Sequence, residues 1–194
     1  MKAQLFVATL AAVTLASCSS KANSFDGKTP EQVATYLAFG LEDKAEAFDK
    51  DMKIVAGETS TQPFTIAVIA NLNGTVVPMM QVVTTTSDNC TFTFAFTPQG
   101  NLRQMMQDTK LSINFTKLKS VKVTTSESAQ FDGAEIQCLE PAGRDWCKKV
   151  NQEPMSGKWQ SRIGPFDKDK SKDGDQARVN EAVAYLQENI CKPQ

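Results

Sequence analysis

The chain has 194 residues, of which 41% are hydrophobic and 22% charged, and its formal net charge is −1. This length and composition fit one ordinary globular domain and argue against a disordered chain. A nucleic-acid binder normally carries a strong basic excess, which is missing here, so we expect no nucleic-acid partner. Histidine is absent, which excludes Ser-His-Asp and Cys-His catalysis and His-ligated metal sites.

The N-terminus is typical of an export signal. Met1-Lys2 supplies a positive start, and the run from Leu5 to Ala16 is uncharged and mostly apolar. This run is too short for a membrane-spanning helix, which needs about 20 residues. A charged start, a short apolar core and small residues at its end together predict a cleaved signal peptide.

The end of this signal, Leu15-Ala16-Ser17-Cys18, resembles the lipobox of bacterial lipoproteins. The resemblance implies that residues 1–17 are removed and that Cys18 carries a diacylglyceryl group and an N-terminal acyl chain. Two or more such chains give stable membrane attachment, since each buried CH₂ contributes about 0.8 kcal/mol. Ser19, where an Asp would retain the protein in the inner membrane, implies the outer membrane. Residues 18–28 then form a short lipidated tether, and we expect the body to lie on the periplasmic face of that membrane.

The remaining cysteines agree with export. Cys90, Cys138, Cys147 and Cys191 form an even set, which predicts two disulfides in an oxidising compartment. We prefer the sequential pairing, Cys90 with Cys138 and Cys147 with Cys191. The alternative closes a small local loop between Cys138 and Cys147 and joins Cys90 to Cys191.

A helix is predicted to start at Thr29, where Thr29 caps the helix, Pro30 takes its first position and Gln32 completes a capping box. Apolar residues then recur at helical spacing and predict one buried stripe. Gly40 weakens the middle of this helix. The stripe contains Val33, Leu37, Leu41, Ala45, Phe48 and Met52.

The central region is predicted to be β-rich. Asn73-Gly74 predicts a hairpin turn between strands over 64–72 and 75–85. Alternation of aromatic residues and threonines predicts a half-buried strand over 90–96. Further strands are expected around residues 111–115, 121–125 and 134–139, with a second hairpin turn at Asp132-Gly133 and a single helical turn over 102–107.

Residues 141–173 are rich in prolines, glycines and charges and predict an irregular segment. Asp175 is expected to cap a final helix whose inner face holds Val179, Ala182, Val183, Leu186 and Ile190. The whole pattern predicts one α+β domain over 29–194, with a largely antiparallel sheet and a helix at each end. The alternative is a β-sandwich or small barrel with peripheral helices.

One acidic segment is a candidate metal site. Asp169, Ser171 and Asp173 alternate before Gly174, and Asp175 follows, as in the first half of an EF-hand-type calcium loop. The segment departs from that pattern because Gln176 replaces an apolar residue and Asn180 replaces the bidentate Glu. A solvated charged loop is the alternative, so we expect either no cofactor or weak calcium binding.

Motifs for phosphate cradles and nucleophilic catalysis are absent from the sequence. We therefore expect a non-enzymatic envelope module, either a binding or adaptor protein or an inhibitor, whose partner is an envelope protein or the cell wall. The alternative is a glycan hydrolase of the cell envelope, since that chemistry needs only two suitably placed carboxylates.

Overall fold

The computed structural model describes residues 23–49, 52–88, 90–125, 128–152 and 172–192. In these residues, the helices are α1 (Pro30–Phe39), α2 (Asp145–Gln152) and α3 (Lys172–Tyr185), with short segments η1 (Gly100–Gln104) and η2 (Leu186–Ile190). The strands are β1 (Glu46–Asp49), β2 (Met52–Thr61), β3 (Phe64–Leu72), β4 (Thr75–Asp88), β5 (Thr91–Pro98), β6 (Thr109–Asn114), β7 (Ser120–Thr125), β8 (Ser128–Asp132) and β9 (Glu135–Glu140).

Helix α1 begins as predicted but is shorter than predicted. The Thr29–Gln32 capping box is present, with the Thr29 N–H donating to Gln32 Oε1 at 2.8 Å. Gly40 ends the helix, because its φ of 70° lies in the left-handed region and its N–H donates to the Tyr36 carbonyl. The predicted continuation of the helical stripe is wrong, since Phe48 belongs to β1 and Met52 to β2.

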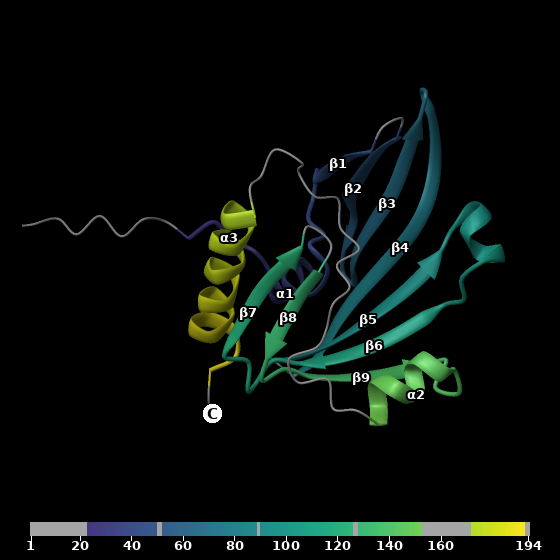
Figure 1. The fold of residues 1–194 in the computed structure, drawn as a ribbon. Helices are drawn as coiled ribbons and strands as arrows, with labels where there is room; N and C mark the ends of the chain where they lie inside the picture. The colour runs from purple at the N-terminus through teal and green to yellow at the C-terminus, as the bar shows by residue number, and fades with distance from the viewer. Residues whose placement is uncertain (1–22, 50–51, 89, 126–127, 153–171, 193–194) are drawn as a thin grey trace, which may run out of the picture.

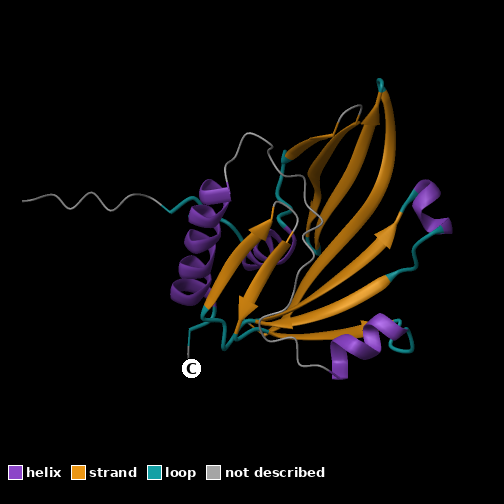
Figure 2. Cartoon of the chain, viewed as in Figure 1, coloured by secondary structure: helices purple, strands orange, loops and turns teal. Residues whose placement is uncertain are grey.

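The strands form one large antiparallel sheet of seven strands in the order β1-β2-β3-β4-β5-β6-β9, and a separate pair, β7-β8 (Figures 1 and 2). Asn73 and Gly74 both have positive φ, at 50° and 87°, as the predicted hairpin turn between β3 and β4 requires. In the described residues β1 and β9 are not paired with each other, so the large sheet is open and the barrel alternative is not observed. The α+β expectation is confirmed at this level.

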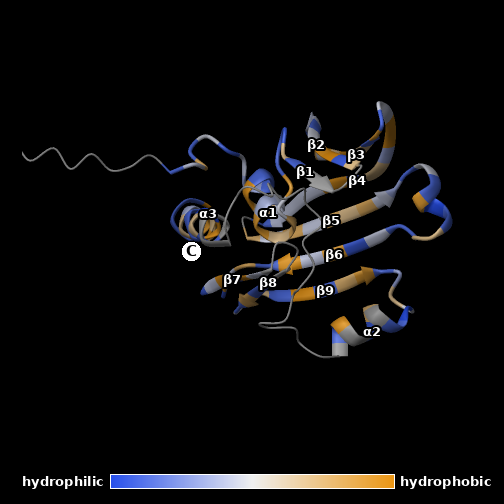
Figure 3. Ribbon diagram, turned by 45° about the horizontal axis from the view of Figure 1, so that its top comes forward, coloured by the Kyte–Doolittle hydropathy of each residue, from blue (hydrophilic) through white to orange (hydrophobic). Residues whose placement is uncertain are grey.

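The core lies where α1 packs on the large sheet. Strand β5 alternates buried and half-buried residues as predicted, and Phe94 and Phe96 point at Phe39 of α1 with ring centroids 4.8 Å away in both cases. Every residue of α1 from Val33 to Phe39 is buried. Figure 3 shows the matching alternation of hydrophobic and hydrophilic residues along the strands. The helix is therefore an internal element, buried on all sides, and not a surface amphipathic helix.

Helix α3 lies on the other side of α1 from most of the large sheet, and the β7-β8 pair packs against α3 (Figure 1). The expected hairpin at Asp132-Gly133 is wrong, because β8 pairs with β7 whereas β9 pairs with β6. Gly133 makes the crossing between the two sheets, with φ 90°, and a Cβ there would lie 1.9 Å from the Lys117 carbonyl oxygen. Only glycine fits this close backbone approach.

The C-terminal helix buries its predicted face and starts earlier than predicted, at Lys172 and not after Asp175. Residues 145–152, expected to be irregular, form α2. Both disulfides are present, but the preferred pairing is wrong: Cys90 is joined to Cys191 and Cys138 to Cys147, with Cα–Cα distances of 5.0 and 5.3 Å. The first bond fastens the end of η2 to the start of β5, and the second fastens α2 to β9.

Candidate functional site

The expected lipidation site, Cys18, lies outside the described residues, and so does the first part of the tether. The described residues begin at Asn23, where the chain is held against α3. The Asn23 side-chain amide donates to the Glu181 carbonyl at 3.2 Å, and Ser24 Oγ donates to Glu181 Oε2 at 2.7 Å. The next residue, Phe25, is 2% exposed and packs on the Tyr36 ring. The later part of the expected tether, from Asn23 onward, is thus an integral part of the fold, which begins before Thr29.

Arg178 of α3 reinforces this junction. Its guanidinium forms a bidentate ion pair with Glu42 and lies over the rings of Phe25 and Tyr36, 5.4 and 4.8 Å from their centroids. Burial by itself lowers the pKa of Arg178, but the hydrogen bonds and charge of Glu42 outweigh this and raise the pKa above its usual value. The arginine therefore stays charged and joins the N-terminal segment, α1 and α3. No spacing in the sequence marks this cluster, because its members come from four separated segments.

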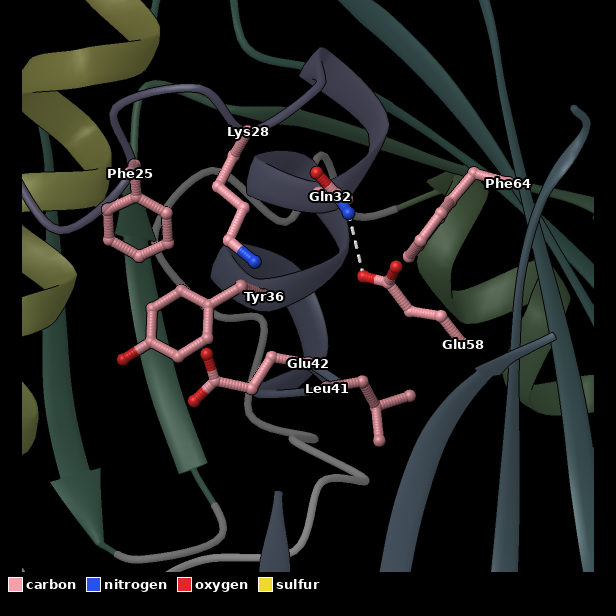
Figure 4. A pocket seen from close by; sticks show the side chains of 8 residues that line it. All are labelled: Phe25, Lys28, Gln32, Tyr36, Leu41, Glu42, Glu58 and Phe64. Carbon is pink, nitrogen blue, oxygen red and sulfur yellow. Dashed lines mark hydrogen bonds between the residues drawn. The ribbon is translucent and has the colours of Figure 1, made fainter. Parts of the chain in front are cut away.

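Beside the junction is a small cavity between α1, β2 and β3 (Figure 4). Gln32 donates to Glu58 across it at 2.7 Å, and the Lys28 side chain points into it. The space holds about one water molecule, so it is too small for an organic ligand. Its two carboxylates already have partners, because Glu42 binds Arg178 and Glu58 binds Gln32.

A wider depression of about 670 Å³ lies over β5, β6 and β9 and extends to α2. The polar residues of its lining include Thr91, Ser112, Asn114, Lys117, Lys119 and Gln137. The lining contains one carboxylate, Glu135, which forms an ion pair with Lys117 at 2.9 Å. Neither this depression nor the small cavity offers a pair of uncommitted carboxylates, which glycoside hydrolysis requires.

Large exposed apolar residues of the described chain lie at one end of the large sheet. They are Leu72, Val76, Met105 and Met106, with exposed fractions of 42, 60, 81 and 43%. We call these four residues the apolar end. Two of them flank the β3–β4 turn, and the two methionines follow η1 at the end of β5.

The register explains why this end stands out from the body. Strand β5 ends at Pro98 opposite Met80, so the β3–β4 hairpin extends past it from Met79 to the turn, over roughly 17 Å. Segment η1 turns back along the base of this extension, where the Gln99 N–H donates to the Met79 carbonyl at 2.8 Å. The sequence carries a weak signal for this feature, since Met105 and Met106 are adjacent within a polar stretch.

The candidate calcium residues are only partly described. Asp169 and Ser171 lie outside the described residues, and Asp173 and Asp175 belong to the first turn of α3, whose backbone is helical from Lys172. The two residues that depart from the calcium pattern have structural roles. The Gln176 side chain forms hydrogen bonds with the backbone of β7 and with the side chain of Asn180. Among the described residues no three acidic or cysteine side chains are grouped so as to hold a metal ion, and the calcium site stays a prediction.

Comparison of the chain with protein-family models, curated proteins and solved structures gives no match. No helix in the described part of the chain is long and apolar enough to cross a membrane.

Proposed function

We propose that the protein is a bacterial lipoprotein, attached through Cys18 to the periplasmic face of the outer membrane, and that it acts there as a non-enzymatic binding module, either an adaptor or an inhibitor. The lipobox-like Leu15-Ala16-Ser17-Cys18 supports the anchor. The two disulfides are consistent with an exported body, since such bonds persist in oxidising compartments.

The observation that carries the binding function is the apolar end. Single exposed apolar residues are ordinary on protein surfaces, but here the large ones in the described residues all lie at the same end of the large sheet, two beside the β3–β4 turn and two after η1. Methionines are common on protein-binding surfaces because their side chains adapt to a partner. The hydrolase alternative has less support, because the carboxylates that line the two hollows have partners.

The anchor is tested by metabolic labelling with palmitate. We expect a labelled mature protein that begins at Cys18, and an unlabelled, unprocessed or released chain for Cys18→Ala. Label that survives this substitution would refute the lipoprotein assignment.

The binding function is tested by crosslinking in cells and affinity capture of the full-length protein. Replacement of Met105 and Met106 by Gln, which keeps their length and removes their apolar character, should abolish recovery of the crosslinked partner. Ala177→Ser, on the exposed face of α3, is the control and should leave recovery unchanged. Equal recovery from both variants would exclude the apolar end as the binding surface. Release of sugar from purified cell wall, without a partner, would instead support the hydrolase.

A further inference from the structure

The way the tether joins the body restricts how the body lies on a membrane. Only the residues between Cys18 and Asn23 separate the proposed lipid from the folded domain, and this stretch spans at most about 18 Å when fully extended. Asn23 and Ser24 are then held by hydrogen bonds to Glu181 of α3, and Phe25 is buried against Tyr36. The tether therefore cannot swing freely around the body, because its last residues are fixed beside α3.

The apolar end lies on the opposite side of the molecule. Figures 1 and 2 show α3 and the start of the described chain at one side, and η1 with the far part of the β3–β4 hairpin at the other. Figure 3, turned about the horizontal axis, shows the same separation.

We propose that the fixed N-terminal junction holds the exposed face of α3 and η2 against the phospholipid headgroups and directs the apolar end away from the membrane. This inference rests on the proposed lipid anchor at Cys18. The partner is then a protein that lies on the side of the body away from the anchoring membrane, and not a protein embedded beside the anchor.

The chemistry of the α3 face fits contact with headgroups and not insertion among acyl chains. Among residues 176–190 of α3 and η2, whose exposure the structure describes, the exposed ones are Ala177, Asn180, Gln187, Glu188 and Asn189, which are polar or small. None of them supplies the large apolar side chains that an interfacial helix buries in a bilayer. Membrane affinity is therefore left to the lipid, while the junction determines only orientation.

The test uses the full-length lipidated protein in vesicles of phosphatidylethanolamine and phosphatidylglycerol. A photoreactive benzophenone amino acid replaces either Ala177 or Met105, both of which are exposed. We expect several-fold more lipid adduct from position 177 than from position 105. Equal adduct from both positions, or more from 105, would overturn the proposed orientation.

Two further variants separate orientation from anchoring. Ten Gly-Ser residues inserted between Ser20 and Lys21 lengthen the tether by roughly 17 Å on average and should reduce the difference between the two positions. Ser24→Ala combined with Glu181→Ala loosens the junction and should do the same. Palmitate labelling is measured on every sample. Absence of label refutes the proposed function itself, whereas a labelled protein without the difference refutes only the orientation.

Discussion

The side-chain amide of Asn151 pairs with the backbone of Cys138 as a neighbouring strand would. Its Nδ2 donates to the Cys138 carbonyl at 2.9 Å, and its Oδ1 accepts from the Cys138 N–H at 2.8 Å. Cys138 lies on β9, the edge strand of the large sheet, so these are backbone groups that β6 does not use. The Cys138–Cys147 disulfide holds α2, and with it Asn151, at this edge.

The smaller sheet has the same arrangement. Gln176 of α3 donates to the Val121 carbonyl at 2.8 Å and accepts from the Val123 N–H at 2.7 Å. Unpaired strand edges invite pairing with another chain, and proteins commonly cover them with a helix or a loop. Here one amide side chain from a helix occupies the edge of each sheet.

Asn151→Ala should therefore both destabilise the protein and promote self-association. It removes two hydrogen bonds, each contributing about 0.5–1.5 kcal/mol, so the free energy of unfolding should fall by about 1–3 kcal/mol. The bared edge of β9 should also increase the fraction of dimers and larger species. Urea unfolding and sedimentation velocity measure the two effects.

Lys148→Ala is the control, because Lys148 is exposed on the same helix. It should leave the stability and the oligomeric state nearly unchanged. Gln176→Ala should reproduce the destabilisation at β7. An Asn151→Ala protein with the stability and oligomeric state of the wild type would show that these amides do not protect the edges.

The sequence predicts correctly the features that depend on interactions between residues a few positions apart. The Thr29–Gln32 capping box, the Asn73-Gly74 turn and the alternation along β5 act within a few residues, and each is present as expected. The length of α1 was mispredicted because apolar residues beyond Gly40 continue at helical spacing by chance, although they belong to a turn and to strands.

Long-range features could not be predicted in this way. The disulfide pairing depends on which cysteines the fold brings together, and the order of the cysteines in the sequence does not determine this. The Asp132-Gly133 dipeptide likewise looks the same in the sequence whether it closes a hairpin or leads the chain from one sheet to the other. The Arg178 cluster and the two amide–backbone pairs join residues far apart in the sequence, and nothing in their local sequence distinguishes them from surface residues.

The two disulfides should differ in their contribution to stability. Cys90 and Cys191 are 101 residues apart, whereas Cys138 and Cys147 are 9 apart. Loop-closure entropy then predicts that replacing the first pair by Ser costs about 5 kcal/mol and replacing the second costs about 3 kcal/mol. Urea unfolding of the two double variants measures this order, and a reversed order would contradict the entropic explanation.

Asp88 should make stability depend on pH below neutrality. Its Oδ1 accepts hydrogen bonds from the backbone N–H groups of Cys90 and Thr91, and chiefly the Cys90 bond lowers the pKa of the carboxyl. Because the folded pKa is the lower one, the stabilisation is complete above the unfolded pKa of about 3.9 and is lost as pH falls through the folded value. The difference in stability between the wild type and Asp88→Asn should therefore shrink as pH falls below about 4. A difference that is constant in urea titrations across that range would assign the role of Asp88 to something other than its charge.

Two buried hydroxyl groups form a hydrogen bond between α1 and β4. Thr35 and Thr84 are 0 and 1% exposed, and their Oγ1 atoms are 2.7 Å apart. Thr35→Val keeps the shape of the side chain but leaves the Thr84 hydroxyl without this partner, so unfolding should become easier by about 1–3 kcal/mol. Thr84→Val should have the same effect for the same reason.

The double variant should recover most of that loss, because it removes both polar groups from the core together. A double-mutant cycle by urea unfolding should therefore give a coupling energy close to the sum of the two single losses and opposite in sign to them. Additive losses would mean that each hydroxyl is stabilised independently of the other. In that case the pair would not join α1 to β4, and the position of α1 on the sheet would depend on its other contacts.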